Sequence, residues 1–192
     1  KSTYFSLKTY FYPDQSESFK ITQYEIRIAE SGMVSIVKRK IRIRRIHMEE
    51  DPARLVHVGG IGGRYVLVDY NRSGIPLIEI VTEPDIESPK EARLYLQKLV
   101  TILEYLGVYD SFSKAVVKTD ANISVEGGER VEVKNITGTK EIENALKFEV
   151  TRQANLLGRG KEIRRETRLW NPERGKTEAM RGKEEEAEYG YI

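Results

Sequence analysis

Apolar and polar residues alternate with a period close to two over much of residues 1–85, where aromatic and β-branched residues recur. Turn-forming pairs such as Pro13-Asp14 and Ser31-Gly32 interrupt this alternation, as they commonly do between strands. The glycine-rich stretch 59–63 is not followed by the Gly-Lys-Ser/Thr of a phosphate-binding loop, so it predicts a hairpin loop. This part of the chain is therefore predicted to be rich in β-strands.

The apolar period then lengthens to that of a helix. Between residues 92 and 106 the apolar positions fall on one helical face, with Ser88 placed as the N-cap and Gly107 as the stop. A second helix is predicted from about residue 139 to 157, with β segments before and after it. This order of elements predicts an α+β fold built around a mostly antiparallel sheet.

The strand predicted within residues 38–51 changes phase at Arg44-Arg45, where the alternation slips by one residue. Such a slip predicts a β-bulge, and bulges often redirect side chains next to active sites. One interpretation is that the bulge aims the acidic cluster 49–51 into a cleft. The other is a solvated strand end, because bulges also occur at ordinary sheet edges.

A further acidic residue, Glu79, lies in the middle of the apolar run 77–81. Apolar residues on both sides of it predict a strand that is buried on both faces. An unpaired carboxylate is costly to bury, so Glu79 must be paired, protonated or bound to a cation. The residues alone leave open whether it forms a salt bridge, for example to Arg72, or belongs to a functional site.

Residues 118–135 predict a hairpin with one polar face. A three-residue loop at 127–129 would pair Val125 with Val131 and Ile123 with Val133, which keeps the apolar residues together. The opposite face would then be a polar panel, although antiparallel sheets often carry one solvated face without a special function. The members of this panel are Asp120, Asn122, Ser124, Glu132 and Lys134.

Composition narrows the possible chemistry. The 192 residues include 32 Lys+Arg and 30 Asp+Glu, no Cys, and only His47 and His57. Disulfides, thiolate zinc sites and cysteine nucleophiles are thus excluded, and a metal would have to bind mainly oxygen ligands, as Mg²⁺ and Ca²⁺ do. No apolar stretch approaches the ~20 residues of a membrane-spanning helix, so no membrane partner is expected.

A series of short motifs extends over nearly the whole chain. They are Tyr-Phe-Tyr-Pro-Asp at 10–14, Ile-Thr-Gln-Tyr at 21–24, Arg-Ile-His-Met-Glu-Glu-Asp at 45–51, Leu-Val-Asp-Tyr-Asn-Arg at 67–72, the stretch 74–85, Asp-Ala-Asn-Ile-Ser at 120–124, Glu-Val-Lys-Asn at 132–135, Glu-Thr-Arg-Leu-Trp at 166–170, and Met-Arg at 180–181 before Lys-Glu-Glu at 183–185. In composition and order, this series resembles the GatB family, the B-type subunits of the tRNA-dependent amidotransferases.

The resemblance implies a fold and a reaction. Residues 1–192 would form a single cradle domain, akin to the glutamine synthetase/guanido-kinase fold, with helices packed on one side of a curved sheet. ATP and Mg²⁺ would serve to phosphorylate the side-chain carboxylate of misacylated Glu-tRNA(Gln) or Asp-tRNA(Asn), and channelled ammonia would then form the amide. The implied partners are an amidase (the A-type subunit) and a small third protein (the C-type subunit) of a cytoplasmic heterotrimer, together with the tRNA.

The resemblance also assigns residues. Glu50 and Glu79 match two carboxylates that hold the family's cation. Lys8 matches a lysine at the end of the ammonia channel, and Asp120 matches an aspartate close to the site. The residues that contact ATP are not assigned.

The chain also departs from the family pattern. Residues 15–20 differ from Leu-Pro-Lys-Gly-Tyr-Gln, and the opening Gly-Leu-Glu-x-His motif and the later tRNA-gripping domains are not in the sequence. We therefore expect a fragment that is inactive alone. The alternatives are the archaeal paralogue of the E type, a non-catalytic RNA-binding β module, and a degenerate copy.

Overall fold

The computed structural model describes residues 2–9, 12–23, 25–58, 65–113, 115–180 and 190–191. The chain divides into two compact units. The first contains Lys1–Met33, Arg42–Glu83 and Glu184–Ile192, and the second contains Val34–Ile41 and Pro84–Lys183. Strands and helices are mixed in the pattern expected from the sequence, so the α+β prediction is confirmed.

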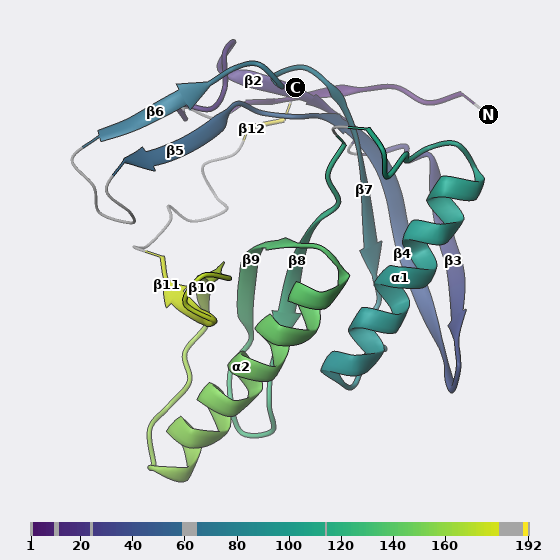
Figure 1. Ribbon diagram of the computed structural model, residues 1–192. Helices are drawn as coiled ribbons and strands as arrows, with labels where there is room; N and C mark the ends of the chain where they lie inside the picture. Colours follow the sequence, from purple (N-terminus) through teal and green to yellow (C-terminus); the bar gives the residue numbers. More distant parts are fainter. Residues whose placement is uncertain are drawn as a thin grey trace. The chain divides into compact units, whose positions relative to one another are not determined.

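Most of the first unit is an antiparallel sheet with the strand order β12-β1-β2-β4-β3, in which β7 also pairs with β4 (Figure 1). The end of β3 and the start of β4, within Val34–Ile41, belong to the second unit. A separate antiparallel hairpin is formed by β5 (Arg54–Val58) and β6 (Tyr65–Asp69). The strands of the larger sheet are β1 (Ser6–Thr9), β2 (Phe19–Thr22), β3 (Ala29–Ile36), β4 (Arg39–Glu50), β7 (Pro76–Thr82) and β12 (Gly190–Tyr191).

The predicted bulge is confirmed in β4. The register between β4 and β7 shifts between Ile43 and Arg45, at the position where the alternation slips. After the bulge the pairing is regular, so alternate residues of β4 point to opposite faces of the sheet. This alternation after the bulge places Glu49, and not Glu50, on the face of His47.

The second unit packs two helices with a four-stranded sheet, ordered β11-β10-β9-β8. The helices are α1 (Pro89–Tyr105) and α2 (Thr139–Gly158), and α2 crosses the face of β8 and β9 (Figure 1). The pair β9–β10 is parallel and the other pairs are antiparallel. The strands are β8 (Lys118–Ile123), β9 (Val131–Thr137), β10 (Glu166–Asn171) and β11 (Lys176–Ala179).

Both predicted helices are confirmed. The Ser88 side chain accepts a hydrogen bond from the Glu91 amide at 3.2 Å, which satisfies one of the donors left open at a helix start. Fully buried apolar residues of β9, including Val131 and Val133, form the core with Ala145 of α2. Each larger apolar side chain that is fully buried contributes about 1.5–3 kcal/mol to folding.

The register predicted for the β8–β9 hairpin is wrong by two residues. Ile123 pairs with Val131, not Val133, and the connection is correspondingly longer. Val125 leaves the ladder because its amide donates to Gln153 Oε1 of α2 at 3.3 Å. Since the side-chain period of a strand is two, this shift preserves which residues share each face.

Candidate metal centre and the charged sheet faces

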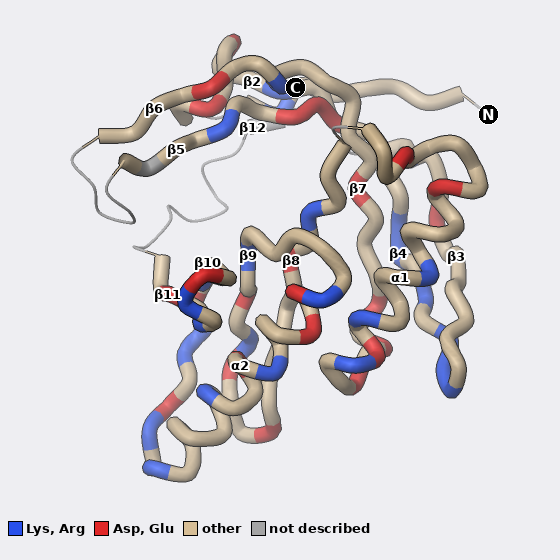
Figure 2. The backbone as a smooth tube through the Cα atoms, viewed as in Figure 1, with Lys and Arg blue, Asp and Glu red and all other residues tan. Residues whose placement is uncertain are grey.

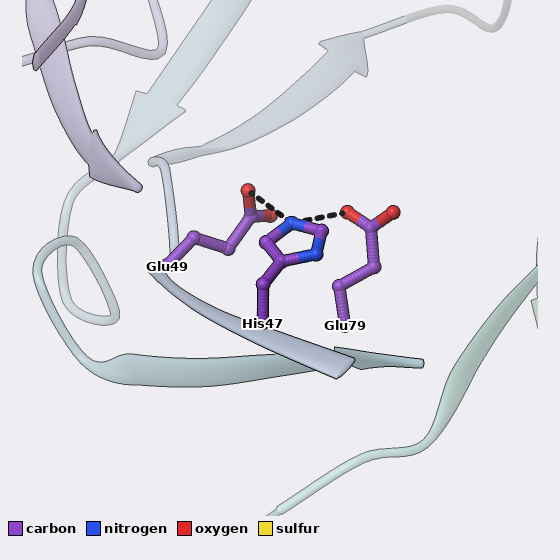
Figure 3. A group of neighbouring side chains, drawn as sticks. All are labelled: His47, Glu49 and Glu79. Atoms are coloured by element: carbon purple, nitrogen blue, oxygen red, sulfur yellow. Dashed lines mark ion pairs between the residues drawn. The ribbon is translucent and has the colours of Figure 1, made fainter. Parts of the chain in front are cut away.

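The β4–β7 ladder brings a histidine and two glutamates together. His47 of β4 pairs directly with Glu79 of β7, and directly paired residues share a face of the sheet. Glu49 lies two residues after His47 in the same strand, so it points to the same face. The three side chains converge from these two strands in Figure 3.

The distances in this cluster fit a small cation site. His47 Nε2 lies 3.5 Å from Glu79 Oε2 and 3.9 Å from Glu49 Oε2. One ligand atom from each residue falls within 4.8 Å of the others. His47 is only 7% exposed, whereas the Glu79 side chain is 45% exposed. A ligand could therefore reach the cluster from the side of Glu79.

Two cationic side chains flank the cluster. Lys20 Nζ of β2 lies 2.8 Å from Glu49 Oε2, and an Arg45 guanidinium nitrogen lies 3.7 Å from Glu79 Oε1. The hydrogen bond with His47 lowers the pKa of Glu79; burial opposes this effect, and the charges of His47, Arg45 and Lys20 add to it. The carboxylate of Glu79 is therefore held in its ionised form, which a metal ligand requires.

The donor set fits a divalent cation. Two carboxylates and one imidazole are ligands that such ions accept, with the carboxylates suited to Mg²⁺ or Mn²⁺ and the imidazole to transition metals. The buried Nδ1 of His47 has no hydrogen-bond partner among the described residues. Its ring orientation is therefore set by the contacts of Nε2 with Glu49 and Glu79 and by packing.

The structure separates the two glutamates that were predicted as metal ligands. Glu79 belongs to the cluster, but alternation in β4 places Glu50 on the opposite face from His47 and Glu49. Glu50 Oε1 instead accepts a hydrogen bond from the Ile21 amide of β2 at 2.7 Å. Its role as a ligand stays a prediction.

Sequence reasoning missed His47 as a member of the cluster, and it named Glu49 only within the acidic cluster 49–51, not as a partner of His47 and Glu79. The signal that could have found them is their spacing of two within a strand, which places both side chains on one face. The alternative proposed for Glu79 is a salt bridge to an arginine such as Arg72. An arginine does pair with Glu79, but it is Arg45, at 3.7 Å, whereas Arg72 pairs with Asp51 at 3.1 Å.

The expectation that the strand of Glu79 is buried on both faces is also wrong. β7 pairs only with β4 among the described strands, and each of its residues remains accessible to some degree. An unbroken apolar run does not distinguish a central strand from an antiparallel edge strand. Because Glu79 is partly exposed, the cost of burying an unpaired carboxylate no longer argues for a bound cation. The evidence for a site is instead the set of charged residues around Glu79.

Lys8 lies on β1, directly opposite Lys20 of β2 in the register. It therefore points to the sheet face that carries Lys20 and Glu49. Like charges directly opposite each other are destabilising, and the ion pair of Lys20 with Glu49 offsets part of that repulsion.

The polar panel of the second unit is present. Lys134 Nζ lies 2.9 Å from Asp120 Oδ2 and 3.2 Å from Glu132 Oε1, and Thr167 of β10 donates to Glu132 Oε2 at 3.2 Å. Burial alone would lower the pKa of Lys134, but Asp120 and Glu132 together raise it above its usual value. Asp120 thus belongs to the second unit and the His47 cluster to the first.

Some predicted features lie outside the described residues. These are the glycine-rich loop 59–63, parts of the first two motifs at Tyr10, Phe11 and Tyr24, and the motif residues from Arg181 onward. Basic and acidic positions occur along both units (Figure 2). No helix among the described residues is long and apolar enough to cross a membrane.

Comparison with known proteins places this geometry in context. The family model described as "GatB/GatE catalytic domain" matches residues 1–192. A relative from Methanoregula boonei, named as the B-type subunit of aspartyl/glutamyl-tRNA(Asn/Gln) amidotransferase, is 57% identical over 98% of this chain and 40% of its own length. Relatives of the same name from Methanospirillum hungatei and Saccharolobus solfataricus are 56% and 50% identical, again over 98% of this chain and 41% of their own lengths.

The match thus covers the whole chain but only part of each relative. The chain spans about two fifths of the length of these curated proteins. The chain belongs to the GatB/GatE catalytic domain family.

Proposed function

We propose that this chain is the catalytic domain of a tRNA-dependent amidotransferase, and that it activates the side-chain carboxylate of misacylated Glu-tRNA(Gln) or Asp-tRNA(Asn). The observation that carries the proposal is the cluster of His47, Glu49 and Glu79 on the β4–β7 ladder. The names of the relatives support the substrate class. Such an enzyme would act in the cytoplasm, where its tRNA substrate is used.

The reaction needs an activated carboxylate, because a carboxylate has no usable leaving group. In the proposed first step, a side-chain oxygen of the aminoacyl group attacks the terminal phosphorus of ATP, and ADP leaves. Ammonia then attacks the acyl carbon, inorganic phosphate leaves, and the nitrogen loses a proton to form the amide. Enzymes catalyse phosphoryl transfer mainly by positioning the reactants and neutralising charge.

A divalent cation, when bound, would neutralise the negative charge of the phosphates. Glu79, Glu49 and His47 are the residues that would hold it. Glu50 could join them only if its carboxylate left the Ile21 amide. Lys20 and Arg45 compensate the two carboxylates of the cluster in its cation-free form.

We assign two further residues to the reaction on the family resemblance. Lys8 would help to deliver neutral ammonia, which is the nucleophilic form, from the partner amidase of the A type. Asp120 would act close to the reacting groups, and its ion pair with Lys134 holds the carboxylate in place. The small protein of the C type would complete the heterotrimer.

The proposal is tested by Glu79→Gln in the complex with its partner proteins, ATP, Mg²⁺ and misacylated tRNA. We expect amide formation to fall by about 100-fold or more, as when other charge-stabilising groups are removed from an active site. The matched control is Glu162→Gln, because the Glu162 side chain is 83% exposed and lies in the other unit.

Equal rates of amide formation in the wild type and Glu79→Gln would contradict the proposal. If the complex neither hydrolyses ATP nor forms amide, and RNA binding falls steeply with salt, the chain is instead an RNA-binding module.

A further inference from the structure

We propose that Lys20 is a built-in competitor for the cation at the His47–Glu49–Glu79 cluster, so that a divalent ion must displace its ammonium group before it can bind Glu49. This inference rests on the cation site of the proposed function and adds a residue that sets the affinity of that site. The inference depends on the positive charge of Lys20 and on its position beside Glu49.

The first observation is that the ammonium pairs with the Glu49 oxygen that faces His47. Lys20 Nζ lies 2.8 Å from Glu49 Oε2, and this same oxygen is 3.9 Å from His47 Nε2. The side chains of Lys20 and Glu49 are only 12% and 15% exposed. Water screens such a pair much less than an exposed pair, so its charges compete effectively with an incoming ion.

The second observation is the contrast with the other flanking cation. Arg45 lies 3.7 Å from Glu79 Oε1, whereas His47 Nε2 is closest to Glu79 Oε2 at 3.5 Å. Arg45 and the histidine thus approach different oxygens of Glu79. A cation could bind Glu79 with Arg45 in place, but it could not bind Oε2 of Glu49 while Lys20 remains there.

The third observation is the neighbourhood of Lys20 in the sheet. The register places Lys8 directly opposite Lys20, and like charges directly opposite each other in a ladder are destabilising. The ion pair with Glu49 offsets part of this repulsion at Lys20, so moving Lys20 away from Glu49 is unfavourable by itself. This cost lowers the affinity of the cluster for any cation that needs both carboxylates.

The sequence supplies a suitable test variant. Lys20 is the last residue of the stretch 15–20, which departs from the family pattern ending in Gln. Lys20→Gln removes the charge and keeps an extended polar side chain, and Lys20→Met retains the apolar stem without a charge. Lys20→Arg keeps the charge. Lys147→Gln is the matched control, because Lys147 forms an i,i+4 ion pair with Glu143 on the surface of α2.

The experiment is a calorimetric titration of the purified protein with MnCl₂, without nucleotide or tRNA, together with thermal unfolding in the presence and absence of Mn²⁺. We expect Lys20→Gln and Lys20→Met to bind Mn²⁺ about tenfold more tightly than the wild type, from removal of one poorly screened positive charge. Mn²⁺ should also raise the unfolding temperature of these variants more than that of the wild type. Lys20→Arg and Lys147→Gln should bind Mn²⁺ like the wild type.

Unchanged Mn²⁺ affinity in both neutral variants would overturn the inference. If Glu79→Gln weakens Mn²⁺ binding in the same titration, the cation site itself stands and only the role of Lys20 is lost. If the wild type and Glu79→Gln bind Mn²⁺ equally, the cluster is not a cation site and both proposals fail. Thermal unfolding without Mn²⁺ identifies any variant that does not fold.

Discussion

Glu79 shows how one residue depends on its neighbours across the sheet. Its hydrogen bond with His47 is the main cause of its lowered pKa, and the charges of Arg45 and Lys20 act in the same direction. The side chain is half exposed, so its ionisation is maintained by these partners against only a partial burial penalty. Glu79 is thereby available as an anionic ligand at neutral pH.

The lowered pKa of Glu79 predicts a change in acid stability. Its folded-state pKa lies below the reference value of 4.5, so the stability it contributes is fully present above that value and is lost as the pH falls through the folded-state pKa. Glu79→Gln should remove this contribution. Between about pH 6 and pH 3, the free energy of unfolding should therefore decrease less in the variant than in the wild type.

This prediction is measured by urea unfolding at a series of pH values, with Glu162→Gln as the exposed control. If the free energy of unfolding falls with decreasing pH equally in Glu79→Gln and the wild type, the partners of Glu79 do not stabilise its charge in the folded state.

Gln15 is a buried polar residue whose side-chain amide finds no partner in the part of the chain that the structure describes. It is 8% exposed, and its Oε1 and Nε2 have no hydrogen-bond partner among the described residues. Residues 15–20 depart from the family pattern, which has Leu at the position of Gln15. Gln15→Leu should therefore raise the free energy of unfolding by about 1–3 kcal/mol, the usual cost of an unsatisfied buried polar group.

Chemical denaturation of Gln15→Leu measures this effect. Gln97→Leu on α1 is the control, since Gln97 is exposed and surface substitutions usually change stability by less than about 0.5 kcal/mol. A loss of stability in Gln15→Leu would mean that its amide has a partner, such as a buried water molecule.

At the scale of elements, the pairing of β4 with β7 creates the candidate site. The phase slip at Arg44-Arg45 predicted the bulge, because a period of two is visible in a single strand. The partner strand and the register were not predictable, because they depend on contacts between distant segments. The sequence therefore indicated Glu79 as unusual but did not show that His47 lies opposite it.

The β8–β9 hairpin illustrates the same limit. The polar panel was predictable because a register shift of two residues leaves both faces unchanged. The loop length was not, because Val125 bonds to α2 and Gly128 approaches Ile163 so closely that an added Cβ would lie 2.9 Å from Ile163 Cδ1. These are tertiary contacts that turn residues alone do not reveal.

A buried ionic network joins α2 to the sheet of the second unit. Glu149 is 0% exposed, receives hydrogen bonds from Arg152 and Gln153 of α2, and accepts one from Thr177 of β11 at 2.9 Å. Burial alone would raise the pKa of Glu149, but these hydrogen bonds and the charge of Arg152 lower it overall. The network therefore fixes the helix against the sheet that carries Asp120.

Breaking this network should be costly. Glu149→Gln removes the fully buried anion that Arg152 and Arg168 share and leaves both paired with Glu166. The loss of one partner from a buried ion pair typically costs about 3–5 kcal/mol, and we expect the lower end of this range because Glu166 remains. Thermal and urea unfolding measure the loss, with Glu162→Gln again as the exposed control. A change below about 1 kcal/mol, typical of exposed ion pairs, would contradict a structural role for the network.

At the scale of the whole molecule, the family and the α+β class were predictable from the sequence. The motifs and the apolar periods are distributed along the entire chain, so each could be seen without a structure. The division into two compact units was not expected from the sequence, because no low-complexity linker separates them. The assignment of residues 1–192 to a single cradle domain and the roles of Lys8 and Asp120 stay predictions.

The central claim is that His47, Glu49 and Glu79 hold a divalent cation, and pulsed electron paramagnetic resonance of Mn²⁺ bound to the nucleotide-free protein tests it most directly. A coordinating imidazole gives a nitrogen hyperfine coupling. Since His47 and His57 are the only histidines in the sequence, each can be replaced by Gln in turn. We predict that the nitrogen coupling is present in the wild type and His57→Gln and absent in His47→Gln. A bound Mn²⁺ without nitrogen coupling in the wild type, or with coupling retained in His47→Gln, would contradict the account.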